Sequence, residues 1–209
     1  MQFFDFHHHD STKTDGIFNL SKNNIVPSGF FSAGIHPWNI NDDWELEFEK
    51  IKGLSQLPNC VAIGECGLDG LIKTPDELQR KIFLKHTEWA QNIGKSLIIH
   101  CVRRFPEIIH LTQKTSVPKV VHGFNKNKNI AHSLLENGFH LSFGKAALHS
   151  VSLQNILREV PEDRFFLETD AEDFNIENLY QKTAEIRQTS PEKIQEIIYY
   201  NFEKIRNGN

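Results

Sequence analysis

The chain has 209 residues, of which 39% are apolar and 24% charged, and we expect a single globular domain over residues 1–209. Its net charge of −4 argues against a globally basic surface of the kind that coats nucleic acid. No apolar run approaches the ~18 residues of a membrane-spanning helix, and we expect no signal peptide and no membrane partner.

Short β-type runs and helical patterns alternate along the chain. Strand character is found over residues 1–8, 16–20, 29–35, 59–68, 95–102, 118–124, 139–144 and 163–170. Helical apolar spacing is found over residues 75–94, 105–114, 127–138 and 150–159, with two further helices in the tail. This alternation predicts a parallel α/β sheet wrapped by helices, and eight strands predict a (β/α)8 barrel.

The front of the chain is short for such a barrel, which typically takes ~250 residues. Only six residues separate His9 from Gly16, and eight separate Leu20 from Gly29, whereas a parallel crossover usually takes a dozen or more. We therefore expect a shortened barrel that lacks helices around its first three strands. We also expect the strand at 16–20 to run antiparallel to its neighbours or to leave the barrel.

The first strand ends on three consecutive histidines in "FFDFHHHD". Side chains alternate faces along a strand, so Asp5, His7 and His9 share one face. His8 points the other way, and we expect it to pack behind the strand. Two imidazoles on one face make half of a metal site.

Other strands of the predicted barrel also end on metal-ligating side chains, at the edge where barrel enzymes build their active sites. These residues are Glu65, His100, His122 and Asp170. With the two histidines of the first strand they make four imidazoles and two carboxylates, a donor set that suits zinc, manganese, iron or nickel better than calcium. Six protein ligands are too many for one open tetrahedral ion and fit two ions that share a bridging carboxylate.

Seven segments follow one another within residues 3–174: "DFHHHD", "AGIHPW", "VAIGECGLD", "QRKIFLKHTEWAQNIGKSLIIHC", "VVHGF", "LSFG" and "FLETDAEDF". In order and character they resemble the TatD family of metal-dependent hydrolases, which belongs to the amidohydrolase-like barrels. The resemblance implies metal-dependent hydrolysis of phosphodiesters, often DNA trimmed from its 3′ end by a deoxyribonuclease. It implies one metal at His7, His9, Glu65 and Asp170 and a second at Glu65, His100 and His122.

Two divalent ions suit this chemistry because they lower the pKa of a shared water toward ~7 and stabilise charge on a phosphoryl oxygen. Glu65 and Asp170 are the expected catalytic residues, with Asp170 both ligating a metal and accepting the proton of the water. The ions could be zinc, manganese, magnesium, nickel or iron.

Two further residues are candidates for substrate binding. His36 matches the family motif in a loop that helps to form the substrate pocket, although it could equally be a hydrogen-bonded loop histidine. Arg103 could clamp a phosphate through its guanidinium, or could lie at a solvated helix start. We expect Glu168 to orient ligands by hydrogen bonds and Asp69 to be structural.

Two departures from the family pattern shorten the segments that would surround the site. They are the short polar region at 10–29 and the missing long loop after Asp170. Three functions therefore stay open: a phosphodiesterase or deoxyribonuclease, a barrel hydrolase acting on a small phosphoester or amide, and a non-enzymatic metal-binding module. The expected partner is a phosphodiester substrate, with DNA a candidate; the oligomeric state stays open. Three cysteines without CxxC spacing are typical of reduced thiols, so we expect a cytoplasmic protein.

Overall fold

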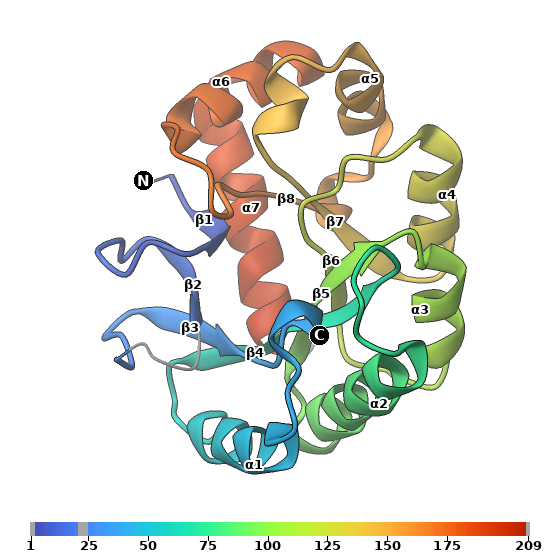
Figure 1. Cartoon of the computed structure of the whole chain (residues 1–209). Helices are drawn as coiled ribbons and strands as arrows, with labels where there is room; N and C mark the ends of the chain where they lie inside the picture. The colour runs from blue at the N-terminus through green and yellow to red at the C-terminus, as the bar shows by residue number, and fades with distance from the viewer. Residues whose placement is uncertain (1–2, 21–24, 208–209) are drawn as a thin grey trace.

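The computed structural model describes residues 3–20 and 25–207, and its eight strands form one parallel sheet in sequence order (Figure 1). The strands are β1 (Asp5–His8), β2 (Gly16–Leu20), β3 (Phe30–Ala33), β4 (Cys60–Asp69), β5 (Ser96–Val102), β6 (Lys119–Val121), β7 (Phe139–Phe143) and β8 (Phe165–Leu167). The backbone N–H of Asp170 donates to the His7 carbonyl at 2.9 Å, which brings the end of β8 back to β1. The (β/α)8 barrel is therefore confirmed.

Helices surround most of the barrel. They are α1 (Trp44–Leu54), α2 (Asp76–Ile93), α3 (Phe105–Leu111), α4 (Lys128–Glu136), α5 (Val151–Glu159), α6 (Ile176–Arg187) and α7 (Pro191–Arg206). In the described residues no helix lies between β1 and β2 or between β2 and β3, as expected, and Figure 1 shows loops at this flank. No helix of the described chain is long and apolar enough to cross a membrane.

The expectation for residues 16–20 was wrong, because β2 lies within the sheet and pairs in parallel with both β1 and β3. The reason is the shortness of the strands. A strand of four residues, such as β1, rises only about 13 Å. The residues from His9 to Asp15 can span about 23 Å when extended. A loop without a helix is therefore long enough to bring the chain from the end of β1 back to the start of a parallel β2.

Helix α1 lies between β3 and β4 and was not expected from the sequence. It buries Trp44, Phe48 and Ile51, which stand four and three residues apart on one face. These side chains form a second core cluster with Phe18 and Phe31 of the helix-free flank. The apolar spacing of α1 was therefore a readable signal, and it places Trp44 in the core.

The C-terminal helices close the barrel from the amino-terminal ends of its first strands. The Phe202 ring of α7 lies 4.3 Å from Phe4 and 5.2 Å from Phe30, measured between ring centroids. The Tyr180 hydroxyl of α6 donates to the Phe4 carbonyl at 2.7 Å. Helix α7 begins with Ser190 as its N-cap, whose hydroxyl accepts from the backbone N–H of Lys193.

His86 ties α2 to the end of β3 and gives a test of acid stability. Its Nε2 accepts from the Ile35 N–H at 3.0 Å, and its Nδ1 donates to the Ile82 carbonyl at 2.8 Å. Burial lowers the pKa of His86 to about 4 from 6.5. Below pH 6.5 the unfolded chain binds a proton here that the folded chain does not. The free energy of unfolding should therefore fall by up to roughly 3 kcal/mol as the pH drops toward 4.

Urea unfolding of the wild type and of His86→Gln at pH 7 and at pH 5 checks this expectation. Glutamine can still accept a hydrogen bond but does not titrate, so its unfolding free energy should depend less on pH. Burial also lowers the pKa of His140 to about 4, but His140 is present in both proteins and its contribution cancels. Equal pH dependence in the two proteins would exclude His86 as the source.

Candidate metal centre

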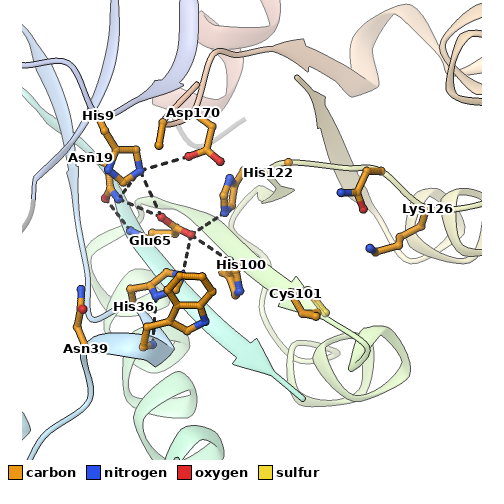
Figure 2. Close-up of a pocket in the computed structure, with 15 residues that line it drawn as sticks. His9, Asn19, His36, Asn39, Glu65, His100, Cys101, His122, Lys126 and Asp170 are labelled. Carbon is orange, nitrogen blue, oxygen red and sulfur yellow. Dashed lines mark hydrogen bonds and ion pairs between the residues drawn. The ribbon is translucent and has the colours of Figure 1, made fainter. Parts of the chain in front are cut away.

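The carboxyl ends of the strands open into a pocket of about 510 Å³ (Figure 2). Its lining includes Asn19 from β2, Glu65 from β4 and His100 from β5. His9, His36, His122 and Asp170 line it from the loops that follow β1, β3, β6 and β8. Because all strands are parallel, their carboxyl ends meet at one edge and bring together residues that are far apart in the sequence.

Glu65 lies at the centre of this group and is 4% exposed. Its Oε1 has three imidazole nitrogens nearby, from His36 at 3.1 Å, His100 at 3.1 Å and His122 at 2.7 Å. Its Oε2 faces the first strand, where Nε2 of His7 lies at 3.4 Å and Nε2 of His9 at 3.8 Å. The two oxygens of one carboxylate therefore face two different sets of histidines.

Asp170 supplies the second carboxylate, on the β1 side of the pocket. Its Oδ1 lies 3.3 Å from Nε2 of His9 and 3.8 Å from Nε2 of His7. Its side chain is 39% exposed, so it meets both the histidines and the solvent of the pocket. Asp170 has a left-handed backbone with φ of 54°, a conformation that strains residues with a side chain.

Three groups of side chains could each hold a metal ion, with ligand atoms within 4.8 Å of one another. They are His7–Glu65–His122, His7–His9–Asp170 and His36–Glu65–His100. All six residues expected as metal ligands are thus brought together, and His36 joins them. The structure places His36 beside Glu65 rather than only at the pocket rim, and its Nδ1 accepts from the Trp38 N–H at 3.1 Å.

His7 shows that these residues fit a metal ion. It is fully buried, and neither of its ring nitrogens makes a hydrogen bond within the described chain. An imidazole buried without a partner is destabilising by about 1–3 kcal/mol. A divalent ion bound at Nε2, beside two carboxylates, would give this nitrogen a partner, and imidazole nitrogen with carboxylate oxygen is a usual donor set for such ions.

The charges of the site keep both carboxylates ionised. Burial by itself would raise the pKa of Glu65, but His122, His100 and His36 hold that pKa well below its usual range. Burial also acts to raise the pKa of Asp170, but the hydrogen bond with His9 and the nearby His122 lower it to about 2. Both side chains are therefore anionic at neutral pH, as candidate metal ligands must be.

Three residues contact the candidate ligands from behind. The buried Glu168 accepts from the Gly123 N–H at 2.5 Å and lies 3.4 Å from Nδ1 of His122, in the orienting position expected for it. Asp69 was expected to be structural only, but its Oδ2 lies 3.2 Å from Nε2 of His100. A proton on Nε2 shared with Asp69 leaves Nδ1 of His100 free as a ligand.

The third residue, Asn19, escaped the sequence prediction. Its Nδ2 donates to Oε2 of Glu65 at 3.0 Å, and its Oδ1 accepts from the backbone N–H of Glu65 at 3.2 Å. This two-point contact fixes the central carboxylate. Asn19 is the fourth residue of β2, the strand that was expected to run antiparallel or leave the barrel, so nothing pointed to it.

Replacing Asn19 by alanine should weaken metal binding by about 10–100-fold, because Glu65 loses its orienting partner. Titration of the metal-free protein with Zn²⁺ against a chromophoric chelator measures this affinity. Asn39→Ala is the matched control, because Asn39 lines the same pocket without contacting Glu65. Equal affinities in the two variants would show that Asn19 does not position the ligand.

The remaining expected residues lie outside the ligand cluster. His8 is buried behind β1, where its ring centroid lies 5.9 Å from the ring centroid of Phe18. Arg103 does not line the metal pocket but a neighbouring groove, so its contact with substrate stays a prediction. Cys101 is buried yet borders the pocket, and all three cysteines are free.

Comparison with known proteins gives one family and one fold. The family model described as TatD related DNase matches residues 6–207. The uncharacterized metal-dependent hydrolase YcfH of Escherichia coli K12 is 30% identical over 157 residues, which cover 72% of this chain and 57% of YcfH. The 3′–5′ ssDNA/RNA exonuclease TatD of Musicola paradisiaca is 31% identical over 150 residues, covering 67% of this chain and 56% of that protein. The chain thus spans little more than half the length of these curated relatives.

Solved structures show the same barrel. The E. coli TatD homologue YjjV superposes with a TM-score of 0.81 at 17% identity, covering 97% of each chain. A TatD family hydrolase from Entamoeba histolytica superposes with a TM-score of 0.79 at 15% identity, covering 98% of each. At these identities the likeness concerns the fold.

Proposed function

Because the chain belongs to the TatD related DNase family and brings candidate metal ligands together in one pocket, we propose that it is a divalent-metal-dependent phosphodiesterase that cleaves nucleic acid. The observation that carries the proposal is Glu65, a buried carboxylate whose two oxygens face separate sets of histidines. Such a carboxylate can bridge two ions, which is the arrangement that hydrolysis of phosphodiesters uses.

Two divalent ions fit the residues of the pocket. His7, His9, Glu65 and Asp170 would hold the first, and Glu65, His100 and His122 would hold the second, with His36 beside them. When bound, the ions supply Lewis acidity, which lowers the pKa of a water and stabilises charge on the phosphoryl group. The donor set of nitrogen and oxygen atoms accepts zinc, manganese, magnesium, nickel or iron.

The chain's own residues perform three tasks in this proposal. Glu65, fixed by Asn19, joins the two ligand sets. His100, oriented by Asp69, presents Nδ1 to the pocket. Asp170 is ionised and 39% exposed, so its carboxylate can reach a water in the pocket and accept its proton.

Phosphodiesters of nucleic acid are the proposed substrates. A relative that covers two thirds of the chain is named a 3′–5′ exonuclease of single-stranded DNA and RNA. The pocket is partly lined by the cationic side chain of Lys126, which suits an anionic substrate although the chain is acidic overall.

Cleavage by the metal-depleted protein after metal is added back tests the proposal. The substrates are a 3′-labelled single-stranded oligonucleotide and bis(p-nitrophenyl) phosphate, and the metals are Mn²⁺, Mg²⁺, Zn²⁺, Ni²⁺ and Fe²⁺. We expect cleavage that requires metal and that His100→Ala abolishes. Metal binding without cleavage of either substrate would contradict a phosphodiesterase and would favour small phosphomonoesters or amides.

A further inference from the structure

A second cavity of about 500 Å³ lies beside the metal pocket, between helices α3 and α4. These helices run side by side on the outside of the barrel (Figure 1). Pro106 and Ile130 give it apolar walls, Asn129 and Ser133 add an amide and a hydroxyl, and no carboxylate among the described residues lines it. We call this cavity the α3–α4 groove.

Lys126 connects the groove to the metal pocket, because its side chain lines both cavities. Figure 2 shows its ammonium directed from the loop after β6 toward the pocket. A ligand that enters the metal centre and extends past Lys126 therefore continues into the groove.

The two cations of the groove, Arg103 and Lys126, are unpaired. Neither makes an ion pair or hydrogen bond with any residue in the described part of the chain. The adjacent Arg104 is different, since its guanidinium contacts Asp76 at 2.6 Å and Glu107 at 2.5 Å. Arg103 and Lys126 thus leave positive charge available beside the proposed site of a phosphodiester.

The backbone at Arg103 is strained in a way that its internal contacts do not explain. Its φ of 59° lies in the left-handed region, which is unfavourable by about 1–2 kcal/mol for residues with a Cβ. Among the described non-glycine residues only Asp170 and Gln188 share this conformation. Gln188 ends a helix and Asp170 is a proposed ligand, and backbone strain that no helix end explains clusters at sites that bind ligands.

We propose that the α3–α4 groove binds a nucleotide that flanks the scissile bond of a single-stranded nucleic acid, with Arg103 and Lys126 on its phosphate. The proposal rests on the proposed function. A guanidinium matches two phosphate oxygens, and an ammonium adds a point charge. The apolar walls at Pro106 and Ile130 can receive a base face, which must be unpaired to lie there.

Binding of a fluorescein-labelled oligothymidine, followed by anisotropy in EDTA, tests the groove without requiring cleavage. Arg103→Gln and Lys126→Gln should each raise the Kd about tenfold. The slope of log Kd against log salt concentration should fall by about 0.7 for each lost phosphate contact. Arg103→Lys should keep the salt slope while binding more weakly than the wild type.

Lys114→Gln is the matched control, because Lys114 is exposed in the turn after α3 and also unpaired in the described structure. It should leave the Kd and the salt slope unchanged. In cleavage assays, Arg103→Gln should lower kcat/KM more for the oligonucleotide than for bis(p-nitrophenyl) phosphate, which has no flanking nucleotide.

The outcomes separate the groove from the proposed function. The proposal for the groove would be wrong, even if DNA is cleaved, if the wild type binds no more tightly and with no greater salt dependence than a double variant that carries Arg103→Gln and Lys126→Gln. Binding that depends on Arg103 and Lys126, in a protein that cleaves nothing with any metal, would support the groove and overturn the phosphodiesterase.

Discussion

Replacing Glu65 by glutamine is expected to lower kcat by about 10³-fold or more. The amide is neutral, so both histidine sets lose their shared anionic ligand, and the set that faces the amide nitrogen loses this ligand altogether. Loss of several kcal/mol of metal-derived stabilisation corresponds to that factor. Steady-state cleavage of bis(p-nitrophenyl) phosphate with saturating Mn²⁺ measures the change, and the metal content of the same sample shows its origin.

Glu168→Gln is the control for this substitution. Glu168 is also buried, and a glutamine there can still accept from the Gly123 N–H, so its effect should stay within about 10–100-fold. Thermal unfolding of both variants checks that they are folded. A Glu65→Gln enzyme that keeps more than about a tenth of the wild-type kcat would contradict the bridging role.

Replacing Asp170 by asparagine is expected to lower kcat by about 10²–10⁴-fold while part of the metal remains bound. Asparagine cannot accept the proton of a water, but His7, His9 and Glu65 still offer ligands at that side of the pocket. Metal content and hydrolysis rate, measured on the same preparation, separate the two roles of the carboxylate.

Asp173→Asn, an exposed carboxylate in the same loop, should leave both quantities unchanged. Near-normal hydrolysis by Asp170→Asn would exclude Asp170 as both ligand and base.

The six candidate ligands were predictable as a group because His9, His122 and Asp170 closely follow strands, while His7, Glu65 and His100 lie in the carboxyl-terminal parts of theirs. The period of two places His7 and His9 on one face, and parallel strands bring their carboxyl ends to one edge. Neither rule depends on the loops. The side chains therefore meet in one pocket even though the expected direction of β2 was wrong, and their binding of metal stays a prediction.

The supporting residues were not predictable by the same rules. Asn19 reaches Glu65 only because β2 is parallel to its neighbours. That direction depends on whether the short loop after β1 can reach back along the strand. Asp69 lies at the far end of β4, beyond a register shift between Ile63 and Cys66 that changes which side chains face the pocket. The position of His36 beside Glu65 depends on a loop conformation that periodicity does not determine.

Binding of two ions across Glu65 is tested most directly by electron paramagnetic resonance of the Mn²⁺-loaded protein, together with its manganese content. We expect close to two Mn²⁺ per chain and a spectrum of exchange-coupled spins, which Glu65→Gln converts to isolated Mn²⁺. A single Mn²⁺ per wild-type chain, or two that give an uncoupled spectrum, would contradict a carboxylate-bridged two-metal site.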